Sequence, residues 1–201
     1  MQSSISPSDL TTAEERRVVP GETGLWVLIL GELAAFGLFF TLVVWFRGEN
    51  TELFAAGQAE LHQDYAVLNA FVLLTSSLLV ARGLRLARLD DARSWRLFGG
   101  AIVCGALFTA VKALEYTGLV REGHTAGSNE FFVYYYFLTG LHLGHVLIGM
   151  AALGVAVALC RPSNGSPTAA RHEAAIAGIA VFWHLVDLLW IMLFALLYLM
   201  A

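Results

Sequence analysis

Long apolar segments dominate the chain and alternate with short polar connections. Each segment is long enough to cross a hydrocarbon core about 30 Å thick, which takes roughly 20 helical residues. A helix satisfies its own backbone hydrogen bonds inside that core, so the pattern predicts membrane-spanning α-helices. The predicted fold class is therefore an all-α integral membrane bundle of five transmembrane helices. The apolar segments lie at about 25–46, 66–87, 95–116, 131–160 and 173–200.

The polar remainder divides the chain into a tail and one membrane domain. Residues 1–22 form a polar N-terminal tail, expected to be a loosely ordered cytoplasmic leader, and residues 23–201 form the five-helix domain. The tail has no basic stretch leading into a short apolar segment and a cleavage site, so we expect no cleaved signal peptide. Two connections, around 47–64 and 117–130, are expected outside the membrane. The first is acidic, which indicates a solvated loop or a docking surface for a basic donor protein.

Basic residues predict the orientation of the helices. Nine of them fall on the side of the N-terminus and three on the opposite side. The positive-inside rule then places the N-terminus in the cytoplasm and the C-terminus outside, in a multi-pass protein of the cell membrane. The nine are Arg16, Arg17, Arg82, Arg85, Arg88, Arg93, Arg96, Arg161 and Arg171, and the three are Arg47, Arg121 and Lys112.

Composition excludes several classes of protein. With 58% hydrophobic and 14% charged residues, the chain is too apolar for a typical soluble domain. No basic patch with interleaved aromatic residues faces a soluble surface, so we expect no nucleic-acid partner. The two cysteines, Cys104 and Cys160, form no C-x-x-C motif, which argues against covalent haem and thiolate metal sites.

Ionisable side chains inside the apolar segments are the candidate functional residues. Glu32 lies in the first segment, His142 and His145 in the fourth, and His184 and Asp187 in the fifth. Residues three apart share one helix face. Such groups are costly in hydrocarbon unless they meet partners. We therefore expect the three histidines and Asp187 to form a polar network in the core of the bundle, and Glu32 to be a buried, proton-linked acid.

Three interpretations of these groups stay open at this stage. They can be interhelical hydrogen bonds that hold the bundle together. They can ligate a metal or a haem, with His184 facing His142 or His145 as the second axial ligand. They can belong to a proton or ion path in which Glu32 exchanges protons.

Two further motifs predict helix contacts. Lys112 and Glu115 are three residues apart, which predicts an ion pair near the outer interface with Tyr116 as an aromatic anchor. Gly140 and Gly144 form a G-x-x-x-G motif, which predicts a face where another helix approaches closely.

Taken together, the motifs resemble subunit III of the haem–copper oxidase superfamily over nearly all of residues 20–200. Five spans match the short form of that family. Gly31-Glu32 resembles part of its first core helix, and Glu115-Tyr116 matches its Glu-Tyr pair. The most specific matches are Thr139-Gly140-Leu141-His142, His145-Val146 and Phe182-Trp183-His184-Leu185-Val186-Asp187-Leu188-Leu189-Trp190.

Within that family the chain looks most like the branch that accompanies nitric oxide reductases, rather than subunit III of cytochrome c or quinol oxidases. Leu143 stands where a glycine commonly follows the first histidine of the motif. The features that resemble the branch are Pro20-Gly21-Glu22-Thr23-Gly24-Leu25-Trp26, Lys112 ahead of Glu115-Tyr116, and Tyr134-Tyr135-Tyr136.

The resemblance implies a non-catalytic accessory subunit with no active site and no cofactor of its own. Haem and copper would belong to the catalytic subunit I. This chain would stabilise that subunit, bind structural phospholipid and support proton uptake in aerobic or nitric-oxide-linked electron transport. Its implied partners are subunit I, other oxidase subunits and membrane lipids. Alternatives from other classes are a stand-alone bis-His haem-b membrane protein and a small proton or solute carrier.

Overall fold

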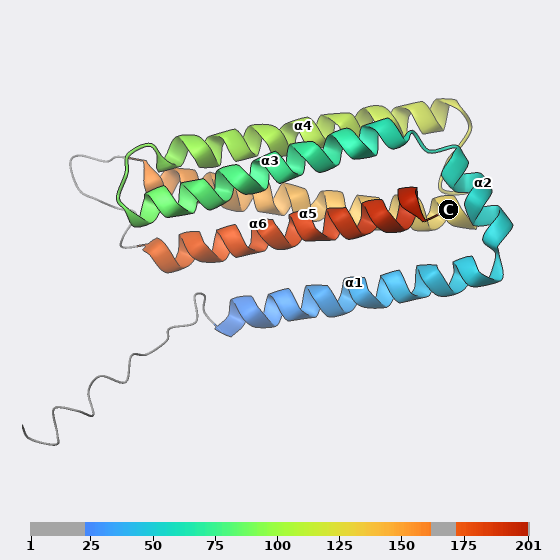
Figure 1. Cartoon of the computed structure of the whole chain (residues 1–201), viewed down its shortest axis with the longest axis horizontal. Coiled ribbons are helices and arrows are strands. Elements are labelled where there is room, and N and C mark those ends of the chain that lie inside the picture. Colours follow the sequence, from blue (N-terminus) through green and yellow to red (C-terminus); the bar gives the residue numbers. More distant parts are fainter. Residues whose placement is uncertain (1–22, 162–171, 201) are drawn as a thin grey trace, which may run out of the picture.

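The computed structural model describes residues 23–161 and 172–200, so the predicted N-terminal tail lies outside the described residues. The described part is helical throughout and contains no strand (Figure 1). Five of its helices are long and apolar enough to cross a membrane, which confirms the predicted fold class. The elements are α1 (Thr23–Glu49), α2 (Thr51–Ala59), α3 (Gln63–Arg88), α4 (Ser94–Arg121), α5 (Glu130–Cys160), α6 (Glu173–Phe194) and a terminal π-helical turn, η3 (Ala195–Leu199).

The connections at the end of the bundle that carries the C-terminus are more structured than the sequence predicted. The segment 47–64 was expected to be a solvated loop, but it contains α2, whose Phe54 is buried. The Phe54 ring packs 5.6 Å from the ring of Phe131 at the start of α5. Likewise, α4 continues to Arg121, whereas its span was expected to end near residue 116. Both differences arise because aromatic contacts at this end extend the packed core beyond the apolar segments.

Helices α3, α4, α5 and α6 form a four-helix bundle around one continuous core. Its largest fully buried side chains include Trp183, Trp190, Phe98 and Phe108. Residues on the inward faces interlock, and Trp190 meets Phe108 edge to face at 4.9 Å. Burial of this many aromatic side chains gives the four helices a fixed relative arrangement.

Helix α1 lies along one side of this bundle, next to α6 (Figure 1). Most of its described surface is exposed, and the buried side chains among the described ones are Ile29, Phe36 and Val43. It contacts the bundle through a seam of rings, such as the pair Phe39–Phe137 at 5.3 Å. Helix α1 is therefore attached to the bundle by a narrow strip.

The predicted contact face at Gly140 and Gly144 is not used within the described chain. A methyl group added at either glycine would meet nothing within 4 Å. Close helix approach occurs elsewhere, because a methyl group at Gly149 would lie 2.7 Å from a Trp183 ring carbon. The prediction was wrong for contacts inside this chain, since the motif lies outside the face of α5 that packs against α6.

Two turns are fixed by residues in the left-handed region. After α3, Asp90 has φ 50°, and the amides of Asp90 and Asp91 bond back to the carbonyls of Ala87 and Leu86. After α4, Gly123 has φ 92°, and its amide bonds back to Val120. Both are Schellman-type helix ends, which satisfy carbonyls that a helix would leave unpaired.

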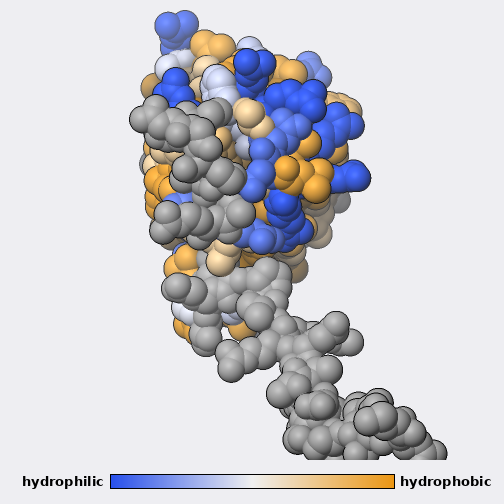
Figure 2. Space-filling model, turned by 90° about the vertical axis from the view of Figure 1, so that its left-hand side faces the viewer, coloured by the Kyte–Doolittle hydropathy of each residue, from blue (hydrophilic) through white to orange (hydrophobic). Residues whose placement is uncertain are grey.

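Hydrophilic side chains gather at the end of the molecule where α3 turns into α4 (Figure 2). Its five arginines are all exposed. This is the end that the charge count assigns to the cytoplasm, and the orientation remains a prediction. The five are Arg82, Arg85, Arg88, Arg93 and Arg96.

Candidate functional site

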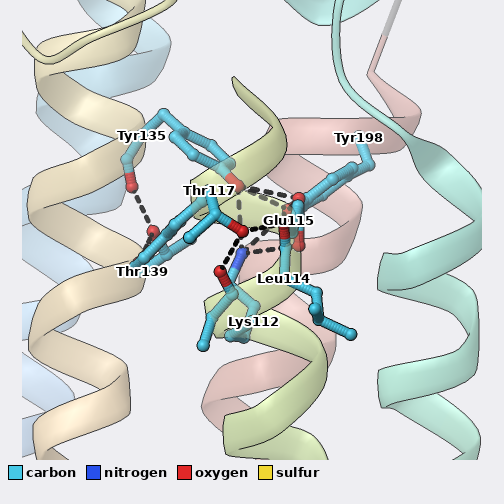
Figure 3. A network of polar contacts seen from close by, with 9 residues as sticks. Lys112, Leu114, Glu115, Thr117, Tyr135, Thr139 and Tyr198 are labelled. Atoms are coloured by element: carbon cyan, nitrogen blue, oxygen red, sulfur yellow. Dashed lines mark hydrogen bonds and ion pairs between the residues drawn. The ribbon is translucent and has the colours of Figure 1, made fainter. Parts of the chain in front are cut away.

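A buried polar cluster lies inside the bundle, near the end opposite the arginines. Nζ of Lys112 lies 3.0 Å from Oε2 of Glu115, 3.0 Å from the Tyr135 hydroxyl and 3.2 Å from the Tyr198 hydroxyl. Both tyrosines donate to Oε1 of Glu115, at 2.7 and 2.6 Å. These side chains converge from α4, α5 and η3, the turn that follows α6 (Figure 3). The side chains of Lys112 and Glu115 thus bond to each other, and both bond to the hydroxyls of Tyr135 and Tyr198.

The surroundings of Lys112 suit a charge removed from water. The side chains of Lys112 and Glu115 are 0% exposed. Four aromatic rings surround the ammonium, with the centroids of Tyr116 and Tyr135 each at 4.9 Å. Rings attract a cation through their quadrupole, and more strongly where water is absent. Removing one partner of such a pair would leave an uncompensated buried charge.

This geometry corrects one expectation and adds residues to it. Lys112 and Glu115 do pair, but the pair is not at an exposed interface, because α4 continues about 13 Å beyond Lys112 to Arg121. Tyr116 is outside the pair and bonds to the Thr139 hydroxyl at 2.7 Å. The extra length of α4 and the covering segment α2 enclose the cluster.

Helix α2 closes the bundle over this end. The side-chain amide of Gln58 donates to the carbonyl of Leu196, and that of Gln63 donates to the carbonyl of Tyr198. Those carbonyls belong to η3, the turn that carries Tyr198 into the cluster. A methyl group at Gly57 would overlap the ring of Phe131, so glycine allows α2 to approach α5. Helix α2 therefore packs on η3, the same turn that places Tyr198 in the polar cluster.

Glu32 contacts the bundle through His145. Oε2 of Glu32 lies 3.1 Å from Nε2 of His145, and the side chains are 28% and 11% exposed. Nδ1 of His145 lies 2.9 Å from the carbonyl of Leu141 and must donate to it, because a carbonyl oxygen only accepts. The pair joins α1 to α5.

His184 and Asp187 form a second polar group on α6. Nδ1 of His184 lies 2.7 Å from the hydroxyl of Ser77 on α3 and 3.8 Å from Oδ2 of Asp187. Asp187 is buried and has no hydrogen bond that satisfies its oxygens in the described residues. This group joins α3 to α6.

The expected network of His142, His145, His184 and Asp187 does not form as one unit. His142 is fully buried, and neither ring nitrogen has a hydrogen-bond partner in the described residues. Its ring stacks on Trp190 at 5.3 Å. The three histidines therefore meet three different environments. Side-chain direction around α5 separates His142 from His145, although they are only one turn apart.

Each histidine of the predicted site has a separate neighbour in the described residues. No three His, Cys, Asp or Glu side chains converge as ligands in residues 23–161 and 172–200. His145 and His184 each contact a separate partner, and His142 stacks on Trp190 and meets Phe108 edge to face. Within this part of the chain, the polar groups join helices in pairs.

The charged residues were identified from the sequence, but the side chains that bond to them were not. Tyr135 was considered only as part of the run Tyr134-Tyr135-Tyr136, although it is fully buried, and neither Tyr198 nor Ser77 was singled out. The available signal was spacing, since Lys112 and Glu115 lie one turn apart, but no pattern identifies which tyrosine faces them.

Comparison with known proteins gives a consistent result. The family model described as cytochrome c oxidase subunit III matches residues 57–201. Cytochrome c oxidase subunit 3 of Corynebacterium diphtheriae is 33% identical over 180 residues, which cover 87% of this chain and 85% of that protein. The protein of the same name from Thermostichus vulcanus is 32% identical, with 89% and 86% covered. A haem–copper oxidase subunit I+III of Aeropyrum pernix is 26% identical over 187 residues, which cover 22% of that longer protein.

Proposed function

This chain belongs to the cytochrome c oxidase subunit III family, and we propose that it is the non-catalytic subunit III of a respiratory haem–copper oxidase in the cell membrane. The observation that carries this proposal is the match along almost the whole length of relatives named cytochrome c oxidase subunit 3. The Aeropyrum pernix relative carries subunits I and III in one chain, which supports the catalytic subunit I as the partner.

A stabilising role suits the polar chemistry of the described residues. The ion pair of Lys112 and Glu115 is enclosed by tyrosines, and His184 is bonded to Ser77. Such contacts hold helices together. Haem and copper would be held by the catalytic subunit, and this chain would support that subunit mechanically.

We extend the proposal to proton uptake and lipid binding. Glu32 and His145 lie in contact at a partly exposed position between α1 and the bundle. Such a pair can hold and return a proton near the entrance to a partner's proton pathway. The largely apolar, exposed surface of α1 would be covered by phospholipid chains or by the partner.

The finer prediction of a branch that accompanies nitric oxide reductases receives no support from the relatives named above, which carry oxidase names. It rests on the tyrosine run Tyr134-Tyr135-Tyr136 and on Lys112 ahead of Glu115. The identity of the copurifying catalytic subunit would decide between oxidase and reductase.

The test is purification through this chain in mild detergent, followed by an optical spectrum and mass spectrometry. We expect a large haem–copper subunit to copurify and to carry all of the haem. A pure chain with stoichiometric haem of its own would overturn the proposal in favour of a bis-His haem protein. A colourless chain without a partner, in freshly solubilised membranes that contain an active oxidase, would also overturn it and favour a carrier.

Glu32→Gln tests the proton-linked part separately. We expect the assembled enzyme to keep its haem content and to lose sustained turnover, because a carboxamide cannot take up and release a proton as the carboxyl group of Glu32 can. Loss of haem in this variant would contradict a purely supportive role. Thr41→Ala in the same helix is the control, since the Thr41 hydroxyl bonds only to a carbonyl of its own helix.

A further inference from the structure

One face of the molecule combines exposed apolar residues with a half-exposed histidine. Helix α6 lies between α3 and α1 (Figure 1), and α1 makes its main contacts with α6 and α2, so part of α6 remains exposed between its two neighbours. The apolar residues of the face, with exposures of 40% to 51%, are Leu74 and Leu78 of α3 and Leu188 and Ile191 of α6. We name it the α3–α6 face.

His184 lies at the centre of this face. It is about 17 Å along the axis from the start of α6, a helix that with η3 extends about 40 Å. Its side chain is 39% exposed, compared with 28% for Glu32 and 0% for Lys112 and Glu115. Nδ1 is engaged by Ser77, which leaves Nε2 as the ring atom able to bond outward.

Three threonine hydroxyls in the spans do not need an external partner. The hydroxyls of Thr41, Thr75 and Thr109 donate to the carbonyl four residues earlier in their own helices. An imidazole has no such route, because its ring cannot fold back to bond both nitrogens to its own turn. Lipid chains offer no hydrogen bond, so a polar side chain at this depth is costly unless it meets protein.

We propose that the α3–α6 face is the surface that docks on a transmembrane helix of the haem–copper catalytic subunit. That helix presents a carbonyl, hydroxyl or carboxylate oxygen opposite Nε2 of His184. The inference rests on the proposed function. The Aeropyrum pernix relative, with subunits I and III in one chain, favours this occupant over a second copy of the chain, because in that protein the two parts occur one to one.

Photocrosslinking tests the assignment directly. A photoreactive phenylalanine analogue is placed at Leu188 in the α3–α6 face or, as the matched control, at Leu107 on α4. The two leucines are 48% and 49% exposed. The complex is isolated through a tagged catalytic subunit from irradiated membranes. We expect a crosslink to the catalytic subunit from position 188 and none from position 107.

The other outcomes overturn the proposal in distinguishable ways. Crosslinks from position 107 alone, or equally from both positions, would show that the α3–α6 face is not the docking surface. Crosslinks from position 188 only to lipid or to a second copy would do the same. If the wild-type chain brings down no haem protein at all, the proposed function fails together with this surface.

The polar contribution is measured by substitution. We expect His184→Ala and Ser77→Ala to reduce the amount of chain retained on the catalytic subunit roughly 3- to 20-fold, as an interhelical hydrogen bond in a membrane would. Thr75→Ala is the control, since its hydroxyl bonds within α3. The helical circular dichroism of each isolated variant shows that the bundle itself is intact. Unchanged retention of both variants would remove His184 from the interface.

Discussion

Helix α1 and the bundle of α3 to α6 have similar apolar sequences but different degrees of packing. The bundle encloses a continuous core and a fully buried ion pair between Lys112 and Glu115. Helix α1 is exposed over most of its surface and is held by a ring seam and by the contact of Glu32 with His145. Hydropathy alone does not distinguish them, since both would cross a membrane.

The difference teaches where the chain is self-sufficient and where it depends on its surroundings. In a membrane, apolar surface by itself gives no drive for helices to associate, so packing and polar contacts decide which helices stay together. The bundle has both kinds of contact in its interior. Helix α1 has few of either among its described residues, so its position depends on contacts such as that of Glu32 with His145 and on whatever covers its outer surface.

The largest effect is expected inside the bundle, from Lys112→Met. The substitution leaves the carboxylate of Glu115 buried without its cation, which costs about 3–5 kcal/mol for a buried pair. The measurement is the midpoint of unfolding in mixed detergent, followed by helical circular dichroism. Lys112→Met combined with Glu115→Gln should recover most of the loss, because the pair is then neutral and keeps an acceptor for both tyrosines.

A milder substitution in the same region gives a reference value for the loss of stability. Tyr116→Phe removes only the contact to the Thr139 hydroxyl and should cost about 1 kcal/mol. If Lys112→Met were no more costly than Tyr116→Phe, the buried pair would contribute little, and the contrast between the bundle and α1 would lose its main support.

The next effect concerns the cap over the bundle, through Gly57→Ala. The added methyl group overlaps the ring of Phe131, so α2 or the ring must shift, at a cost of about 1–3 kcal/mol. Gly48→Ala is the matched control, because a methyl group there would meet nothing within 4 Å. Equal stability of the two variants would show that α2 is not packed as described.

The sequence was sufficient to predict the membrane-spanning helices but not the contacts that they make with other helices. Apolar length predicted five membrane helices because the thickness of the hydrocarbon core leaves few alternatives. Apolar length did not predict α2, because the sequence of a nine-residue helix with one buried aromatic residue resembles that of a polar loop. It also failed at Gly140 and Gly144, because the motif does not state whether the approaching helix belongs to the same chain.

The candidate site shows the same division. The charged and ionisable residues were identifiable because each is costly in hydrocarbon. Their partners were not, because pairing depends on helix rotation. His142 and His145 lie one turn apart, yet one stacks on Trp190 and the other faces Glu32. No periodicity within one helix contains that information.

A smaller effect is expected at the attachment of α1. Glu32→Gln and His145→Asn should show a coupling of roughly 0.6–2 kcal/mol in a double-mutant cycle. Hydrogen exchange read by mass spectrometry should show faster exchange in α1 and unchanged exchange in α3 to α6. Thr41→Ala serves as the control within α1. Faster exchange throughout the bundle would mean that the two regions are not independent.

The smallest effect is expected at the exposed turn between α3 and α4. Arg93 donates from its side chain and its backbone amide to Asp91, which lowers the pKa of that carboxyl from 3.8 to about 2. The folded pKa is depressed, so the stabilisation is present above pH 3.8 and is lost as the pH falls through 2. Asp91→Asn should therefore flatten the acid side of the unfolding midpoint plotted against pH. Salt should shrink the same contribution, because the pair faces water. An acid limb identical to that of the wild-type chain would show that Arg93 does not hold this carboxylate, and would leave the turn to its backbone hydrogen bonds alone.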